Sequence, residues 1–208
     1  MLPPVFCSAY LPPVSCVSMI AAYHRVCIEQ YDNYRKQTFR NRCIIATSSG
    51  RQALTVPVVK PDTPKQLMRD VRISDHGNWR HLHWAAMESA YMNSPFFMYY
   101  EDDLRPLYYK QHSFLMDFNQ ELLSTVLNLI GITVEPVLTE SFAPPSENDY
   151  QEDCRWMIEC PQACVDIPPY YQVFRQKNGF LSDLSIVDLL FNMGPESLLY
   201  LNRLNTRG

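Results

Sequence analysis

The first part of the chain alternates between short apolar runs and one stretch with helical spacing. Residues 5–9 form an apolar run that stops at Pro12 and Pro13, which is typical of a strand. Residues 14–23 repeat apolar side chains with a helical period, so they predict a helix, and Pro13 suits its first turn. A second apolar run covers residues 25–30. The order strand, helix, strand predicts a parallel pair of strands joined by a right-handed crossover.

A β-hairpin is predicted next. Residues 42–47 and 52–59 are rich in side chains that favour strands. The Ser-Ser-Gly-Arg segment between them, residues 48–51, has the composition of a short hairpin loop. Residues 65–69 then predict one helical turn, and residues 71–73 predict a short strand.

The pattern changes to helices after Asn78, which is a good N-cap residue. Ser94 and Pro95 start a second, aromatic helix that is predicted to run through Tyr100. Residues 113–130 have the clearest helical period in the chain, and Gly131 suits the end of that helix. On the helix that follows Asn78, the predicted apolar face consists of Trp79, Leu82, His83, Ala86, Met87 and Ala90.

The remaining third contains an irregular stretch followed by two helices. Residues 136–169 are rich in proline and acidic residues, whereas residues 183–192 and a stretch from Gly194 to about Leu204 have helical character. We therefore expect an α/β fold, with an N-terminal β-α-β unit and a β-hairpin followed by a helix-rich second half packed on the same core. We expect one domain over residues 1–208, made of an α/β part (1–75), a helical part (76–135), an irregular segment (136–169) and C-terminal helices (170–208).

Composition and charge narrow the class of protein. The net charge of −4 and the isoelectric point of about 5.7 argue against a nucleic-acid binder, which depends on basic side chains for its affinity. The first ten residues lack the basic start of a signal peptide, and no apolar run is long enough to cross a membrane. The seven cysteines, an odd number, suit reduced thiols. We expect a cytoplasmic protein without membrane insertion.

Segments that occur in order over nearly the whole chain resemble one known family. They are residues 9–13 (AYLPP), 28–42 (IEQYDNYRKQTFRNR), 54–58 (LTVPV), 79–84 (WRHLHW), 89–91 (SAY), 94–97 (SPFF), 184–192 (LSIVDLLFN) and 194–196 (GPE). On these segments the chain resembles the WbqC-like protein family, most closely its Bacteroidetes-type branch. The wider family often has His-Gln-Pro before Tyr-Leu-Pro, where this chain has Cys7, Ser8 and Ala9.

This resemblance implies a role in surface polysaccharide synthesis, including that of O-antigen. Some family members resemble acyl or aminoacyl transferases that act on amino sugars, so the expected partners are a small-molecule donor and an amino-sugar acceptor. Whether the chain is catalytic is left open, as is a homo-oligomer. One alternative is a non-catalytic binding or assembly partner of a polysaccharide-synthesis enzyme. A weaker alternative is a nucleotide-using transferase, although the paired-histidine signature of such folds is absent.

The basic segment of residues 35–42 is the first candidate for substrate binding. It follows a predicted strand, and ligands of β-α-β sheets bind beyond the carboxyl ends of strands. Arg40 and Arg42 suit a phosphate or carboxylate, Lys36 supplies a point charge, and Asn41 can orient a carbonyl. The alternative is a solvated basic strand edge that discourages pairing with other chains.

His83 and Glu29 are the candidate catalytic residues. If His83 lines a pocket, its near-neutral pKa suits it to take a proton from an attacking amine; otherwise it is a core residue. Glu29 stands at a predicted strand end, where it acts as a base or pairs with Arg35 or Lys36. The residues expected to bind substrate are Tyr10, Lys36, Arg40, Asn41, Arg42, Trp79 and Tyr91.

No metal site and no cofactor are predicted. His81 and His83 point about 200° apart on a helix, so they do not share an ion. Cys154, Cys160 and Cys164 have wider spacing than zinc ligands and lack a nearby fourth ligand. The sequence also lacks the glycine-rich motifs that bind nucleotide phosphates.

Overall fold

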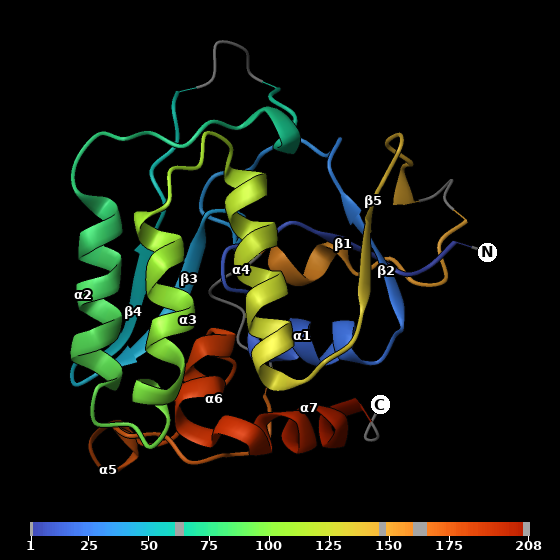
Figure 1. Cartoon of the computed structure of the whole chain (residues 1–208). Coiled ribbons are helices and arrows are strands. Elements are labelled where there is room, and N and C mark those ends of the chain that lie inside the picture. The colour runs from blue at the N-terminus through green and yellow to red at the C-terminus, as the bar shows by residue number, and fades with distance from the viewer. Residues whose placement is uncertain (1, 61–64, 146–148, 160–165, 206–208) are drawn as a thin grey trace.

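The computed structural model describes residues 2–60, 65–145, 149–159 and 166–205 (Figure 1). Its chain opens with strand β1 (Val5–Cys7), helix α1 (Val14–Ala21) and strand β2 (Arg25–Glu29). Strands β1 and β2 are parallel, which confirms the predicted pair, and the predicted α/β class is confirmed as well. Cys7 pairs with Glu29 in this register, so the carboxyl ends of both strands lie side by side.

A third strand, β5 (Glu135–Leu138), pairs in parallel with β2 and gives the sheet the order β1-β2-β5. It lies at the start of the stretch that we expected to be irregular. The sequence hides β5 because it has four residues, includes Pro136 and is largely exposed, so it shows no apolar alternation. Its pairing with β2 creates the strand, and a proline is tolerated there because β5 is an edge strand.

The predicted hairpin consists of β3 (Arg42–Thr47) and β4 (Gly50–Thr55), which are antiparallel. Its turn is tighter than expected, because Thr47 pairs with Gly50 and only Ser48 and Ser49 lie between them. Gly50 has φ of 104°, a left-handed conformation that glycine adopts without steric cost. The second strand therefore begins two residues earlier than predicted.

Three helices lie side by side in Figure 1: α2 (Trp79–Tyr91), α3 (Phe97–Tyr109) and α4 (Leu115–Ile130). Helix α3 runs beyond Tyr100, the predicted end, because Leu104, Leu107 and Tyr108 bury one face despite Pro106 within the helix. Leu82 on α2 is 63% exposed, contrary to its predicted place on the apolar face.

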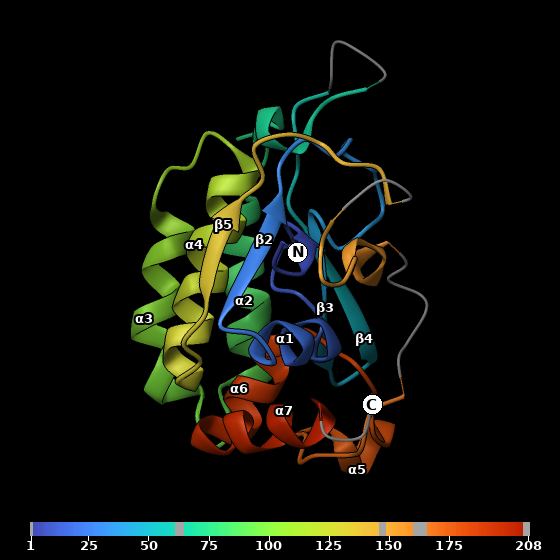
Figure 2. The same ribbon diagram turned by 90° about the vertical axis from the view of Figure 1, so that its right-hand side faces the viewer.

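Short helical segments and two further helices complete the chain. The segments that the structure describes include 3-10 turns and, near the C-terminus, a short helix followed by two longer ones. The short helical segments and the two further helices are η1 (Met68–Asp70), η3 (Arg155–Ile158), α5 (Arg175–Asn178), α6 (Ile186–Met193), η4 (Gly194–Glu196) and α7 (Ser197–Asn205). One hydrophobic cluster includes buried side chains from β1, from the hairpin and from the helices α2, α3, α4, α6 and α7. In Figure 2, α3 and α4 lie on one side of β2 and β5. Among the described residues, no helix combines the length and apolar character needed to cross a membrane.

Candidate functional site

The carboxyl edge of the parallel sheet carries reactive side chains at the end of each strand. Cys7 ends β1, Glu29 ends β2, and Thr139 directly follows β5. All three are buried, and Glu29 has no exposed surface. Because ligands of open parallel sheets bind beyond this edge, its side chains are the first candidates for a functional site.

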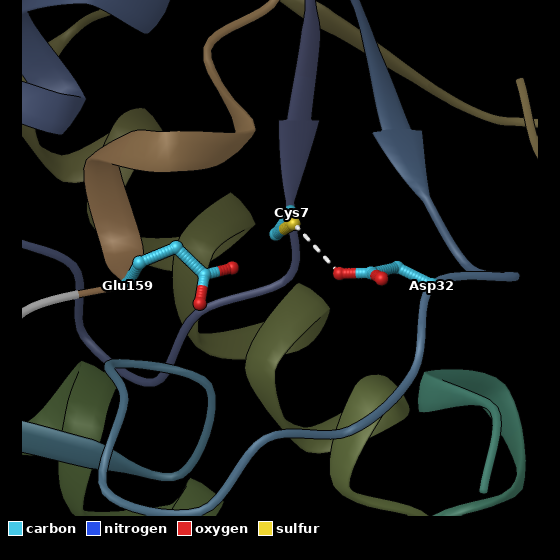
Figure 3. Close-up of side chains that lie close together, drawn as sticks. All are labelled: Cys7, Asp32 and Glu159. Atoms are coloured by element: carbon cyan, nitrogen blue, oxygen red, sulfur yellow. Dashed lines mark hydrogen bonds between the residues drawn. The ribbon is translucent and has the colours of Figure 1, made fainter. Parts of the chain in front are cut away.

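Arg40 organises one half of this edge, with no exposed surface of its own. Its Nη2 donates to Glu159 Oε1 at 2.8 Å, to Cys7 Sγ at 3.5 Å and to Asp32 Oδ2. The thiol of Cys7 in turn donates to Asp32 Oδ2 at 3.7 Å. Figure 3 shows that Cys7 comes from the end of a strand, Asp32 from the loop after β2 and Glu159 from the end of the turn η3.

Arg155 organises the other half. Its Nη1 lies 3.3 Å from Glu29 Oε2, and its Nη2 donates to Asp153 Oδ2 at 2.6 Å. The remaining oxygen of Glu29 accepts from Thr139 Oγ1 at 2.8 Å and from the backbone N–H of Tyr31 at 2.7 Å. Glu29 is therefore fully hydrogen-bonded and pairs with Arg155, rather than with Arg35 or Lys36 as the sequence had suggested.

We call Cys7, Glu29, Asp32, Arg40, Asp153, Arg155 and Glu159 the strand-end cluster. Its four carboxylates face two guanidinium groups, and Arg35 adds a third from the rim, 3.3 Å from Glu159. Within the described residues, four carboxylates thus pair with three guanidinium groups. The Glu159 side chain, which pairs with both Arg40 and Arg35, is 28% exposed, so the cluster reaches the surface at this carboxylate.

The sulfur of Cys7 and the carboxylate oxygens of Asp32 and Glu159 lie within 4.8 Å of one another, close enough to hold a metal ion. Arg40 Nη2 contacts all three groups, however, so its positive charge already stands among these ligand atoms. A divalent ion would have to displace a buried guanidinium. The geometry therefore fits Arg40 better than a metal.

Burial controls the state of the Cys7 thiol. It raises the pKa of Cys7 to about 12, although the charge of Arg40 opposes this rise. The side chain is therefore a thiol at neutral pH, with its proton directed toward Asp32. Such a thiol reacts only when a neighbouring base removes its proton.

A groove of about 410 Å³ opens at the same edge of the sheet. Gln30, which follows β2, and Leu138, which ends β5, form part of its wall. Arg69, Asp117 and Phe114 add a cation, a carboxylate and an aromatic ring. Its size lies within the range of small-molecule sites, and its mixed lining suits a polar ligand.

His83 lies in a second buried group, which we call the tyrosine–histidine cluster: Tyr10, Trp79, His83 and Tyr108. His83 Nδ1 and the Tyr10 hydroxyl share a hydrogen bond of 2.9 Å, and the Tyr10 and Tyr108 hydroxyls lie 2.7 Å apart. The rings of Trp79 and His83 meet edge to face at 5.1 Å. Burial lowers the pKa of His83 to about 4, so its imidazole is neutral near pH 7.

The comparison with known proteins identifies the family. The sequence pattern of the WbqC-like protein family matches residues 8–165, which is more than half of the chain. This chain belongs to the WbqC-like family. A relative from Mycobacterium tuberculosis, named "Uncharacterized protein Rv1507c", is 29% identical over 219 residues, which cover 93% of this chain and 94% of that protein. No solved structure matches the chain. The Bacteroidetes-type branch stays a prediction.

The basic segment of this WbqC-like chain divides between interior and surface. Arg40 points inward, whereas Lys36 is exposed. Arg42 is half-buried on β3 and donates from Nε to Thr55 Oγ1 at 3.1 Å. Asn41 is buried, and its Nδ2 donates to the backbone oxygen of Val56 at 2.8 Å. The segment therefore does not form one clamp.

Tyr91 belongs to a third polar group, around Asp188 on α6. The Tyr91 and Tyr170 hydroxyls donate to the Asp188 carboxylate at 2.9 and 2.6 Å, and Gln172 Nε2 donates at 2.9 Å. Burial nevertheless raises the pKa of Asp188 to about 6. Tyr91 thus serves to satisfy a buried carboxylate of this WbqC-like fold.

Sequence reasoning missed most of the strand-end cluster. Asp153, Arg155 and Glu159 come from the stretch that we expected to be irregular, and no local pattern marks them. Cys7 carried a usable signal, because it stands at the end of a strand. Cys154 is a buried free thiol, and Cys160 and Cys164 lie outside the described residues.

Proposed function

We propose that this WbqC-like chain transfers a short acyl or aminoacyl group to the amine of an amino sugar, in surface polysaccharide synthesis. The strand-end cluster is its site. The observation that carries this proposal is the group of four carboxylates at the carboxyl edge of the sheet, of which Glu159 reaches the surface. An amino sugar presents an ammonium group, and carboxylates attract it.

Glu159 is the carboxylate best suited to the amine. An ammonium group must lose a proton before its nitrogen attacks an acyl carbon, and a carboxylate within hydrogen-bond reach takes that proton. Glu29 already accepts bonds from Arg155, Thr139 and Tyr31, so it holds Arg155 in place rather than acting as the base. Asp32 shares Arg40 with Glu159 and fixes the orientation of the guanidinium.

Other predicted residues take supporting roles in this proposal. The groove beside the strand ends has room for the sugar, with Phe114 as an apolar wall. Lys36 and Arg42 remain candidates for the phosphates of a nucleotide-linked sugar, because both have exposed surface. His83 is neutral and hydrogen-bonded to Tyr10, so it fixes the position of the Tyr10 side chain, three residues after Cys7 in the chain.

The test is a transfer assay with a panel of short acyl-CoA thioesters and a nucleotide sugar that carries a primary amine. Amide product is measured by mass spectrometry for the wild type, Glu159→Gln and Glu135→Gln. Glu135 is the matched control, because it also pairs with an arginine but is exposed on β5. We expect product from the wild type and from Glu135→Gln, and a loss of roughly 10²–10⁴-fold for Glu159→Gln, the range for general base catalysis.

Equal rates for all three proteins would refute the role of the cluster. If the wild type forms no amide with any donor, the transferase proposal fails. A rise in melting temperature with ATP, but not with acyl-CoA, would then favour the nucleotide-using alternative.

One observation favours the alternative of a non-catalytic partner. Met98 and Tyr99 at the start of α3 are 77% and 75% exposed, the highest values among the large apolar side chains of the described residues. By contrast Leu189, Leu190 and Phe191 on α6 are fully buried. If these α3 residues bind another chain, Met98→Lys and Tyr99→Lys should abolish a complex seen by light scattering without changing the melting temperature.

A further inference from the structure

The thiol at the centre of the strand-end cluster has no role in the transfer described so far. Cys7 Sγ lies 3.7 Å from Asp32 Oδ2 and 3.5 Å from Arg40 Nη2, at the end of β1. We propose that Cys7 carries the acyl group as a thioester between the donor and the amine. This inference rests on the proposed transferase function and names its covalent intermediate.

Two buried polar atoms, one on the guanidinium group that contacts the thiol and one on a residue bonded to Ser8, point to a missing ligand. Arg40 Nε is buried and has no hydrogen-bond partner among the described residues, and the same holds for Asn119 Oδ1. Asn119 Nδ2 donates to Ser8 Oγ, next to Cys7, and to the backbone oxygen of Arg40. Buried polar atoms without partners cost stability, so their presence beside a nucleophile indicates that a bound group satisfies them.

Arg40 Nε is the donor for the acyl oxygen. Attack on a thioester or ester creates a negative oxygen, and a fixed N–H donor beside the nucleophile stabilises that charge. The Nη2 atom of the same guanidinium already contacts Cys7 Sγ, so the free donor belongs to the group that touches the thiol. Asp32 accepts the thiol proton, because its Oδ2 is the acceptor of the thiol hydrogen bond.

Acyl transfer through Cys7 takes two steps. In the first, Cys7 Sγ bonds to the acyl carbon of an acyl thioester, its proton passes to Asp32, and the donor's thiol leaves with that proton. In the second, the amine nitrogen bonds to the acyl carbon of the Cys7 thioester, and Cys7 Sγ leaves. The ammonium group loses one proton to Glu159 and then to solvent, and the second N–H proton, lost as the amide forms, returns to Cys7 Sγ through Asp32. No oxidation or reduction occurs.

The burial of Cys7 sets limits on the donor and on side reactions. The residue is 6% exposed, so a short acyl group reaches the sulfur more readily than a long chain. Burial raises the pKa of Cys7 to about 12, so no standing thiolate is present and alkylating reagents should react slowly at pH 7. The thiol becomes nucleophilic only while Asp32 takes its proton.

The experiment uses the full chain with acetyl-CoA and no amine acceptor. After rapid acid quenching and proteolysis, mass spectrometry of the Cys7 peptide should show one added acetyl group that neutral hydroxylamine removes. Cys27→Ala is the control, since Cys27 is a buried thiol within β2. It should keep both label and turnover. Cys7→Ala should lose both, and Asp32→Asn should slow labelling by roughly 10²–10⁴-fold.

The results separate this inference from the proposed function. The thioester is overturned if the wild type turns over without acetyl label on Cys7. It is also overturned if Cys7→Ala turns over at the wild-type rate. Both outcomes leave the transferase proposal intact. If Cys7→Ala unfolds, Cys7→Ser replaces it, and undiminished turnover by that variant also overturns the thioester. Absence of any transfer by the wild type defeats the proposed function itself.

Discussion

The strand-end cluster and the tyrosine–histidine cluster are both buried and polar, yet they handle charge in opposite ways. The first keeps full charges, with Arg40 and Glu29 completely buried. In the second, burial keeps His83 neutral and hydroxyl groups satisfy one another. Buried ion pairs add little stability compared with apolar packing of the same volume. A fold that retains them at a sheet edge therefore has a reason beyond stability, whereas the neutral cluster is explained by packing and hydrogen bonding.

The largest effect that tests this contrast is expected for Arg40→Met. Removal of the guanidinium leaves Asp32 and Glu159 without their shared partner, and breaking a buried ion pair costs about 3–5 kcal/mol. Urea unfolding at pH 7 measures the loss. Arg35→Met is the matched control, because Arg35 pairs with the same glutamate from the surface. Its expected cost is about 1 kcal/mol or less. Similar losses for both variants would show that Arg40 is not a buried charge centre.

His83→Gln tests the neutral cluster through its dependence on pH. The pKa of His83 falls from 6.5 to about 4 on folding, so between these values the unfolded chain binds more protons. The contribution of His83 is therefore complete above pH 6.5 and is lost as the pH falls toward 4. This loss reaches roughly 3 kcal/mol at 1.36 kcal/mol per pKa unit. The stability difference between wild type and variant, measured by urea unfolding at pH 7, 5.5 and 4, should shrink accordingly. A constant difference would mean that His83 is accessible to protons in the fold.

The sequence predicted the parts of the molecule that depend on neighbouring residues. The β-α-β opening and the long helix α4 follow from local periodicity, and both are present. Strand β5 has no such signal, because its pairing with β2 creates it. The site divides in the same way. Glu29 and Arg40 were found because they follow or end predicted strands, whereas Arg155 and Glu159 reach the sheet only through the tertiary path of the chain.

The sequence also did not predict which side chains are buried. Composition marks residues 35–42 as a basic surface, yet Arg40 is completely buried against the nearby Asp32 and against Glu159 from a distant part of the chain. Likewise the helical period placed both Leu82 and His83 on one apolar face, and only His83 is buried. A period fixes which side chains share a direction, but the neighbouring elements decide which direction is covered.

Asp188→Asn sharpens the comparison with a slope of opposite sign. The pKa of Asp188 rises from 3.8 to about 6 on folding, so the folded state binds more protons between these values. The contribution of this carboxyl is therefore greatest below pH 3.8 and is lost as the pH rises through 6. Over pH 4–6 it opposes the effect of His83, which makes the wild-type curve flatter than either contribution alone. The gap between wild type and Asp188→Asn should move against the wild type as the pH rises. The same urea series measures it, and parallel curves would contradict it.

The smallest expected effect comes from a pair with nearly the same separation as Arg155 and Glu29 but much greater exposure. Arg25 and Glu135 approach to 3.4 Å, against 3.3 Å for Arg155 and Glu29, but their side chains are 55% and 67% exposed. Water and salt screen such a pair, so Glu135→Gln should cost about 1 kcal/mol or less and the cost should vanish in high salt. Glu29→Gln removes a charge from a fully buried site, so its cost should be larger and should persist in salt. Urea unfolding with and without added salt compares the two. If both variants lose the same stability and respond to salt in the same way, burial does not distinguish the two ion pairs. The argument that burial makes the strand-end cluster a site would then fail as well.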